Sequence, residues 1–176
     1  MLAKPNLFLV GPMGSGKSAV GKQLARLLRL PFYDSDAEIE RRTGVDLPFI
    51  FEKEGEAGFR QRERETLEIL TAKEHIVLAT GGGAVLLPEN RKVLAQRGRV
   101  VYLKTSVTQQ AERVRQGRVR PLLSNVDPSA KLEELMKFRA PLYAEIADVT
   151  VNTDNRKVRT VAEDILRELD AAEAAR

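Results

Sequence analysis

Residues 11–18 read Gly-Pro-Met-Gly-Ser-Gly-Lys-Ser and directly follow the apolar run Leu7–Val10. They match the pattern G-x-x-x-x-G-K-[ST], and a helix-like segment begins near Lys17, so the order strand, loop, helix is the one this motif requires. Glycines let backbone N–H groups wrap around phosphates, and a helix N-terminus attracts negative charge. The stretch therefore predicts a P-loop fold that binds a nucleoside triphosphate. The expected ATP contacts in this loop are Gly14, Ser15, Gly16, Lys17, Ser18 and Ala19.

Lys17 and Ser18 carry the chemistry of this loop. A lysine at this position reaches the β- and γ-phosphates as a point charge, and the serine hydroxyl is a ligand for Mg²⁺. The loop alone does not distinguish kinases, GTPases and motor ATPases. A GTPase would carry Asn-Lys-x-Asp, which the sequence lacks, and a motor would end a strand in Asp followed by Glu. Here the corresponding run ends in Thr80 and three glycines, which favours a kinase.

Short apolar runs alternate with helical segments along the chain. The expected strands are Leu7–Val10, Pro31–Asp34, Ile76–Ala79, Val100–Leu103 and Asp148–Val151. They read as continuous apolar runs, which is typical of a parallel sheet buried on both faces. A 3.6-residue period places Val20, Leu24, Leu27 and Leu28 on one helix face, and Val161, Ile165, Leu166 and Leu169 on another. The alternation predicts an α/β fold with right-handed crossovers, and no linker divides residues 1–176, so we expect one domain.

Two segments break this alternation. Residues 37–70 read as one long helical insert, interrupted by Gly44, Pro48, Gly55 and Gly58. Residues 116–129 contain two prolines, a glycine and an asparagine and read as an exposed, mobile loop, so we expect a lid over 113–126. In a kinase, an acceptor pocket and a closing lid occupy segments of this kind. The small, polar tail 171–176 is expected to fray.

The composition is that of a soluble globular protein. The 176 residues are 43% hydrophobic and 31% charged, include no cysteine, and contain no run long enough to span a membrane. These features exclude a disulfide framework and a thiolate metal site, and they fit a cytoplasmic enzyme that has no membrane partner. The net charge of +4 raises nucleic-acid binding as an alternative. Because basic and acidic residues are interleaved, and the basic segment 113–120 has no aromatic side chain, we do not expect that role.

Two carboxylates and three glycines suggest the second half of a site. Asp34 and Asp36 follow the second apolar run, where one carboxylate can order Mg²⁺ through water while the other accepts a hydrogen bond from an attacking hydroxyl. Helix capping is the alternative, but it explains only one of the acids. Gly81, Gly82 and Gly83 follow the third run, where the backbone must pass close to a ligand or, alternatively, turn sharply.

Three arginines are further candidates. Taken singly, Arg60, Arg120 and Arg139 fit solvated surface positions. Arg120 lies in the loop that we expect to act as the lid, where an arginine can swing onto the transferring phosphate. The lone His75 precedes a strand without a partner pattern and is expected to be inert.

Together these segments resemble the shikimate kinases, over nearly the whole chain. The motifs that carry the resemblance are residues 34–40 (DSDAEIE), 50–56 (IFEKEGE) with Phe59-Arg60, 80–83 (TGGG), 120–123 (RPLL) and 139–143 (RAPLY). The resemblance implies a three-layer α/β/α fold of the nucleoside-monophosphate-kinase type, with five parallel strands in the order 2-3-1-4-5. It also implies ATP-dependent phosphorylation of the 3-hydroxyl of shikimate, a step toward chorismate and the aromatic amino acids.

Carried over by position, the resemblance assigns roles to individual residues. Asp36 would hold the acceptor hydroxyls and act as the base, Arg60 and Arg139 would bind the shikimate carboxylate, and Gly81, Gly82 and Gly83 would contact the ring. Ser18 and, through water, Asp34 would serve one Mg²⁺ ion, while Lys17 and Arg120 would stabilise phosphate charge and Arg156 would contact the adenine side. Residues 37–70 would form the shikimate-binding insert, and the enzyme would be a monomer.

Three alternatives remain open at this point. A gluconate kinase would share the phosphate loop but has no reason to carry both Arg60 and Arg139. A non-catalytic ATP-binding module would be expected to lose Lys17, Asp36 or Arg120, and all three are present. A nucleic-acid binder using the basic segment would bind in high salt without ATP.

Overall fold

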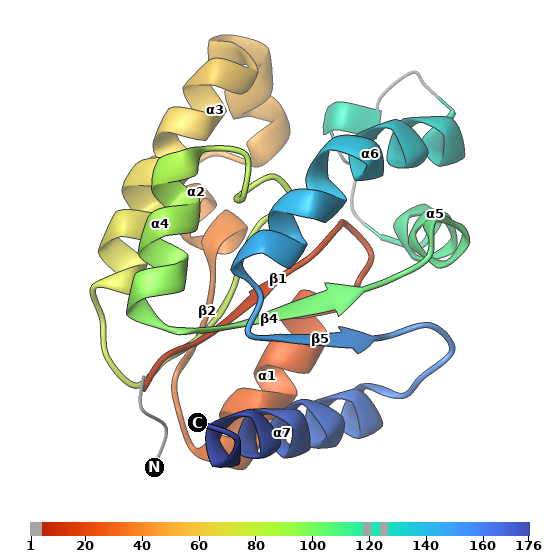
Figure 1. Cartoon of the computed structure of the whole chain (residues 1–176). Helices are drawn as coiled ribbons and strands as arrows, with labels where there is room; N and C mark the ends of the chain where they lie inside the picture. Colours follow the sequence, from red (N-terminus) through yellow and green to blue (C-terminus); the bar gives the residue numbers. More distant parts are fainter. Residues whose placement is uncertain (1–4, 118–120, 124–126) are drawn as a thin grey trace.

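The computed structural model describes residues 5–117, 121–123 and 127–176. Five parallel strands form one sheet in the order β2-β3-β1-β4-β5, as predicted (Figure 1). Their bounds are β1 Leu7–Val10, β2 Phe32–Asp34, β3 Val77–Ala79, β4 Arg99–Lys104 and β5 Val149–Asn152. Leu7 pairs with Val77 on one side and with Arg99 on the other, so β1 lies at the centre of the sheet.

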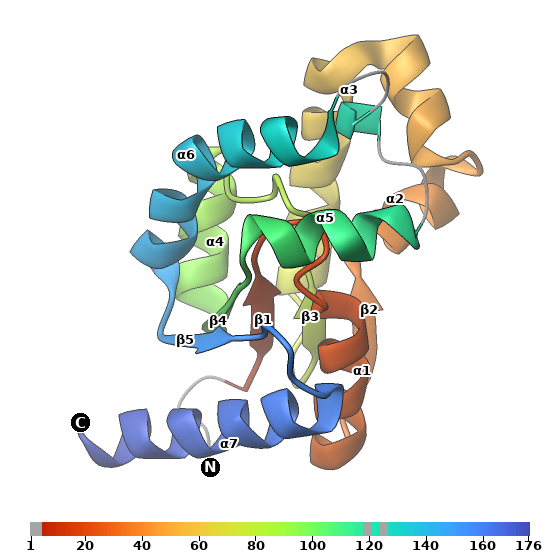
Figure 2. The same ribbon diagram turned by 90° about the vertical axis from the view of Figure 1, so that its right-hand side faces the viewer.

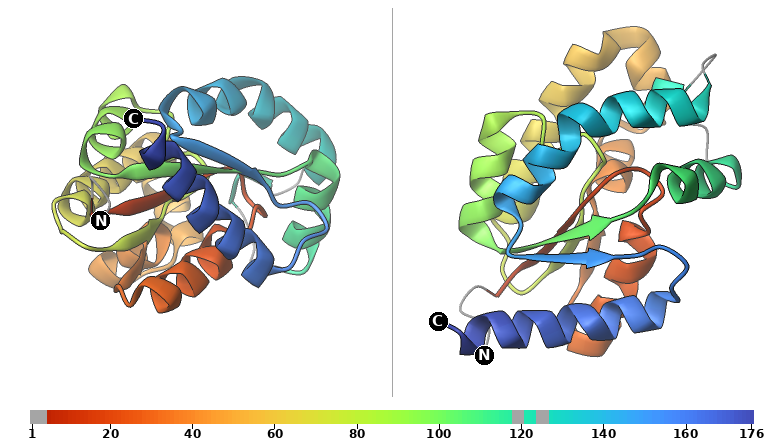
Figure 3. Two further views of the ribbon diagram at one scale, coloured as in Figure 1. Left: turned by 60° about the horizontal axis from the view of Figure 1, so that its bottom comes forward. Right: turned by 45° about the vertical axis from the view of Figure 1, so that its right-hand side comes forward.

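Helices cover both faces of this sheet and make three layers (Figures 1 and 3). In Figure 1, α1 (Lys17–Leu28) and α7 (Val158–Ala174) lie below the sheet, and α3 (Leu47–Thr71), α4 (Pro88–Arg97) and α6 (Pro128–Ile146) lie above it. Two shorter helices, α2 (Ser35–Thr43) and α5 (Val107–Arg115), follow the carboxyl ends of β2 and β4, and a 3₁₀ turn spans Pro121–Leu123. None of the described helices is long and apolar enough to cross a membrane.

Each face of the sheet has its own apolar core. Leu9 and Leu24 belong to the core between the sheet and helices α1 and α7, while Phe8 and Leu67 belong to the core between the sheet and helices α3, α4 and α6. Leu27, predicted on the buried face of α1, is 46% exposed, because it lies in the last turn of that helix. In β5 the two valines are buried and the two polar residues are exposed, so the prediction of continuous apolar runs was wrong for this strand. β5 is an edge strand, and α7 packs on its valine face.

The predicted insert is two helices rather than one interrupted helix. Gly44 ends α2 in the left-handed conformation with φ 75°, and Gly55, with φ 70°, kinks α3. Pro48 does not interrupt α3 but lies in its first turn, where the missing N–H costs nothing. Gly58 is helical, so its predicted role as a breaker was also wrong.

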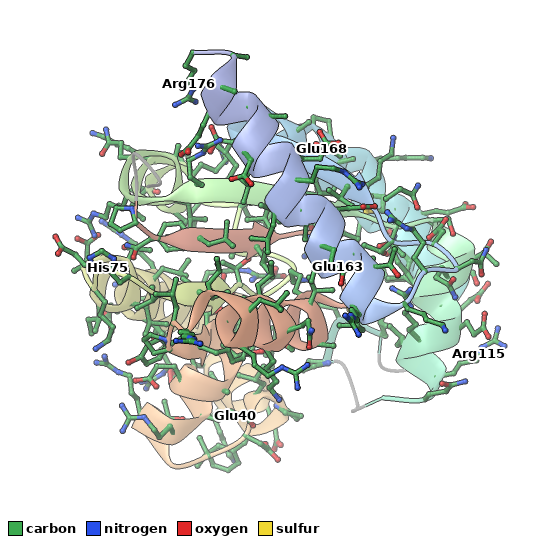
Figure 4. The ribbon with its side chains drawn as sticks, turned by 90° about the horizontal axis from the view of Figure 1, so that it is seen from below. Glu40, His75, Arg115, Glu163, Glu168 and Arg176 are labelled. Atoms are coloured by element: carbon green, nitrogen blue, oxygen red, sulfur yellow. The ribbon has the colours of Figure 1, made fainter. Side chains whose placement is uncertain are left out.

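The tail does not fray as predicted, because α7 continues to Ala174 and its end is tied to the sheet. Arg99, the first residue of β4, is fully buried, and its Nη1 donates to Glu173 Oε1 at 3.0 Å. Arg176 pairs in turn with Asp148. Figure 4 shows α7 crossing this face of the sheet with Arg176 at its end, and His75 far from that end, at the periphery. His75 is exposed in the turn before β3.

Candidate active site

A cleft of about 630 Å³ lies where the loops leave the carboxyl ends of β1, β2 and β3. Ligands of open parallel sheets bind at this edge, and the volume suits a small-molecule site. Figure 2 shows α5 and α6 passing above these strand ends, with α2 and α3 beside them. The cleft brings together most of the residues predicted from the sequence: Gly14, Gly16, Lys17, Ser18, Ala19, Asp34, Asp36, Arg60, Gly81, Gly82, Gly83 and Arg139.

The loop after β1 has the backbone that its glycines permit. Gly14 and Gly16 have φ of 73° and 90°, and α1 starts at Lys17 with no side chain capping its N-terminus. That helix end is therefore available to a phosphate. Lys17 is buried, and its Nζ donates to the carbonyls of Gly11 and Pro12 at 2.7 and 2.8 Å. Ser15, predicted as an ATP contact, is fully buried under the loop and does not line the cleft.

The Asp34 carboxylate accepts three hydrogen bonds from described residues. Its Oδ1 accepts from the backbone N–H groups of Asp36 and Ala37 and so caps α2, which is the alternative considered from the sequence. Its Oδ2 accepts from the Ser18 hydroxyl at 2.5 Å. Capping therefore explains Asp34, while Asp36 lies one residue inside α2 and lines the cleft.

These oxygen atoms fit the expected magnesium ion. Mg²⁺ prefers hard oxygen ligands and usually keeps waters and substrate phosphates around one or two carboxylates. Ser18 and Asp34 offer a hydroxyl and a carboxylate beside the phosphate loop. No group of three or more His, Cys, Asp and Glu side chains among the described residues is placed to hold a metal, so a cation here would depend on the nucleotide for further ligands.

The three glycines after β3 each face a different side chain of the site. A Cβ at position 81 would lie 2.7 Å from Asp36 Oδ1 and 2.9 Å from Glu63 Oε2. At position 82 it would lie 3.3 Å from the Met13 nitrogen and 3.7 Å from Arg139 Nη1, and at 83 it would lie 2.4 Å from Arg60 Nη2. The sharp turn considered from the sequence does not account for these contacts. At positions 81 and 83 the side chains of the site occupy the space where a Cβ would be, while at position 82 the nearest atom belongs to the backbone of the phosphate loop.

Glu63 is the main residue of the site that the sequence analysis missed. It is fully buried, and its Oε1 accepts from Arg60 Nη1 at 2.9 Å, while its Oε2 has no hydrogen-bond partner among the described groups. Burial, against the attraction of Arg60 and with a smaller contribution from the nearby Asp36 charge, raises the pKa of Glu63 to about 7. Glu63 lies three residues after Arg60 on the same helix, a spacing that predicts an ion pair and could have identified Glu63 from the sequence.

Arg60 and Arg139 are buried, although single arginines usually lie on the surface. Arg60 is held by Glu63 and, at 3.2 Å, by Glu56. Arg139 is 4% exposed, and within the described residues no carboxylate forms an ion pair with it. Burial lowers the pKa of the Arg139 guanidinium, which the Tyr143 hydroxyl opposes. A buried cation without a counter-ion that lines a cleft is suited to bind an anion.

Besides Ser15, two predicted residues are not placed in the cleft. Arg156 donates to the Asn152 carbonyl at 3.0 Å, pairs with Asp164 and does not line the cleft. Arg120 lies outside the described residues. The cleft instead includes Arg113, which the sequence analysis noted only for its charge. Its Nη1 donates to the Gly14 carbonyl at 2.8 Å, so α5 contacts the phosphate loop directly.

An aromatic wall completes the cleft on the side of the insert. The rings of Phe51 and Phe59 lie 4.6 Å apart, and both line the cleft together with Leu47 and Pro48. The site therefore combines a phosphate loop, the carboxylates of Asp34 and Asp36 and two buried guanidinium groups with an apolar surface that fits a small carbon ring.

Comparisons with known proteins agree with this arrangement. A family model described as shikimate kinase matches residues 13–170. A shikimate kinase of Thioalkalivibrio sulfidiphilus is 58% identical over 167 residues, which are 95% of this chain and 88% of that protein. A solved structure of shikimate kinase from Acinetobacter baumannii in complex with shikimate is 50% identical, with a TM-score of 0.93 over 96% of this chain and 94% of the other. A gluconokinase from Sinorhizobium meliloti has a TM-score of 0.61 over 97% of this chain and 94% of its own, at 19% identity, which shows the fold alone.

Proposed function

The chain belongs to the shikimate kinase family, and from that premise we propose that its cleft phosphorylates the 3-hydroxyl of shikimate with ATP. The products are shikimate 3-phosphate and ADP, on the route to chorismate and the aromatic amino acids. One observation carries this proposal. The cleft that contains Lys17 and Ser18 also contains Asp36 and two buried arginines, a set that matches an acceptor with both a hydroxyl and a carboxylate.

The carboxylate of shikimate binds at Arg60 and Arg139. Arg139 supports this role because it is buried and lacks an ion pair among the described groups. The backbone N–H groups of Gly82 and Gly83, which also line the cleft, have no partner within the described part of the chain. Two guanidinium groups and these N–H donors neutralise one carboxylate and fix the ring beside them, and Gly81 contacts the ring next to Asp36.

The reacting hydroxyl lies at Asp36. Its carboxylate accepts the proton of the 3-hydroxyl as the oxygen attacks the γ-phosphorus, and the bond from that phosphorus to the bridging oxygen of ADP breaks. Phosphoryl transfer needs mainly positioning and charge neutralisation. Lys17 supplies positive charge from the phosphate loop, and Gly14, Ser15, Gly16, Ser18 and Ala19 bind the nucleotide beside it. As the family resemblance implies, we propose that Arg120 also stabilises the phosphate charge and that Arg156 contacts the adenine side of ATP.

Mg²⁺ is the expected cofactor. Ser18 would hold it directly and Asp34 through water, and the ion would neutralise charge on the β- and γ-phosphates. We also propose that the enzyme acts in the cytoplasm and that it is a monomer. A single species near the chain mass of 19.6 kDa in analytical ultracentrifugation would support the monomer, and a dimer would contradict it.

The test is a coupled assay of ADP release with Mg-ATP and shikimate, gluconate or no acceptor. We expect release only with shikimate, and phosphorus NMR should place the new phosphate on the 3-hydroxyl. Release without an acceptor, or equal release with gluconate, would refute the proposal. Gluconate is the matched alternative because a gluconokinase has the same fold.

A further inference from the structure

Tyr143 lies behind the proposed carboxylate site and does not line the cleft. It is fully buried on α6, four residues after Arg139, so both side chains project from one face of the helix. Its hydroxyl donates to the Gly82 carbonyl at 2.5 Å. One side chain of α6 therefore contacts the glycine loop and lies beside an arginine of the cleft.

Because the Tyr143 hydroxyl donates its proton to the Gly82 carbonyl, its oxygen can still accept a second hydrogen bond. A phenol has one O–H donor, which the Gly82 carbonyl takes, so the remaining lone pairs can face the Arg139 guanidinium. An interaction between the Arg139 cation and the Tyr143 oxygen is consistent with this polarity. The hydroxyl thus holds a backbone carbonyl of the glycine loop from the same helix face that carries the buried Arg139.

The peptide group extends the effect to the next residue. The Gly82 carbonyl and the Gly83 N–H belong to one planar unit, so a fixed carbonyl also fixes the direction of that N–H. The loop itself has no side chains to hold it in place, and glycines are conformationally free. The Gly81 N–H donates to the Ser35 hydroxyl and the Gly83 carbonyl accepts from the Leu86 N–H, and between these two anchors Tyr143 holds the Gly82 carbonyl.

Packing fixes Tyr143 in turn. Its ring lies 5.1 Å from that of Tyr102 on β4, in the apolar core that includes Leu94 and Ala84. Burial raises the pKa of the Tyr143 hydroxyl far above its usual value, so the group stays protonated and remains a donor. A neutral hydroxyl with a fixed position can orient Arg139 without neutralising its charge.

We propose that Tyr143 is a positioning residue for the acceptor carboxylate, acting through the Gly82–Gly83 peptide group and the Arg139 guanidinium. This inference rests on the proposed function, because it assumes that these groups bind the carboxylate of shikimate. It assigns no chemistry to Tyr143 in the transfer step. Removing the hydroxyl should therefore weaken acceptor binding and leave turnover at saturation unchanged.

The test is Tyr143→Phe, which removes the hydroxyl and keeps the ring. We expect the KM for shikimate to rise about tenfold, and kcat and the KM for ATP to change by less than about twofold. Tyr102→Phe is the matched control, since it removes a hydroxyl from the neighbouring ring and should leave all three values within about twofold. Thermal unfolding of both variants checks that the assays compare folded protein.

A neutral acceptor separates positioning from general damage. With methyl shikimate, which lacks the negative charge, Tyr143→Phe should change kcat/KM by less than about twofold. Equal losses for shikimate and its methyl ester, a fall in kcat alone, or a Tyr143→Phe variant that behaves like Tyr102→Phe would overturn the role of Tyr143. If the wild-type chain failed to phosphorylate shikimate, the proposed function itself would fall. These results are distinguishable in one set of assays.

Discussion

Replacing Gly83 with alanine should displace Arg60 from the cleft. The new Cβ would lie 2.4 Å from Nη2, 2.5 Å from Nη1 and 2.6 Å from the guanidinium carbon, whereas ordinary contact begins at 3.4 Å. The guanidinium must therefore retreat by about 1 Å, the difference between 3.4 and 2.4 Å. It is also held at 2.9 Å by the buried Glu63, so it cannot move without straining that ion pair.

A displacement of this size is large for a carboxylate clamp. A hydrogen bond to a charged group contributes about 1.5–3 kcal/mol to binding, and about 1.4 kcal/mol is tenfold in affinity, so we expect the KM for shikimate to rise about 10- to 100-fold. The change should leave kcat within about threefold and the KM for ATP within about twofold, because Arg60 takes no part in phosphate binding. Steady-state kinetics with each substrate varied in turn measures all three. Gly82→Ala is the comparison, since its Cβ would come no closer than 3.3 Å to its neighbours, and we expect a smaller rise.

A double mutant isolates the cause. If the alanine acts by displacing the guanidinium, then Gly83→Ala should add less than about twofold in an Arg60→Ala background. A further large loss in that background would show that the methyl group obstructs the ligand itself, and would refute the reasoning. A single Gly83→Ala variant with wild-type KM would refute it as well.

Three further predictions concern other groups of the cleft. Asp36→Asn should lower kcat by about 100-fold or more while ATP binding, measured by fluorescence titration, changes less than about threefold; loss of both would contradict its role as base. Chelation of Mg²⁺ should stop ADP release, and Ser18→Ala should raise the Mg²⁺ concentration for half-maximal rate about tenfold; an unchanged requirement would exclude Ser18 as a ligand. For Glu63, a folded-state pKa of about 7 against 4.5 means that the folded chain keeps a proton that the unfolded chain releases. Its contribution to the free energy of unfolding is therefore present below about pH 4.5 and falls by on the order of 3 kcal/mol as the pH rises through 7. Urea unfolding across this pH range should show that loss in the wild type and not in Glu63→Gln. The same pH dependence of the free energy of unfolding in both proteins would contradict the prediction.

The sequence predicted the parts of the molecule that depend on local pattern. A phosphate loop requires a particular backbone at residues 11–18, and buried parallel strands leave apolar runs, so the loop and the strands were predictable from local pattern, whereas the order of the strands was implied by the family resemblance. The ends of the helices were less predictable from the sequence. Whether Pro48 breaks or begins a helix depends on a difference of one or two residues in where the helix starts.

The rest of the site depends on contacts between distant segments. An arginine such as Arg139 reads as a surface residue, and only the packing of α6 on the sheet buries it. The glycines at 81–83 suggested a nearby ligand, and that prediction stands untested; the structure adds that Asp36 and Glu63 take the space beside position 81 and Arg60 the space beside position 83, which no local pattern contains. The tail was misjudged for the same reason, since Glu173 pairs with an arginine 74 residues away in sequence.

The contact between Gly83 and Arg60 also limits the order in which this site can change during evolution. While the guanidinium occupies the space beside residue 83, a mutation from glycine to any other residue meets an obstacle 2.4 Å away. Loss of the arginine meets no such obstacle. A lineage that exchanged an acidic acceptor for a neutral one would therefore have to replace Arg60 first. Only then could residue 83 acquire a side chain that shapes the new pocket.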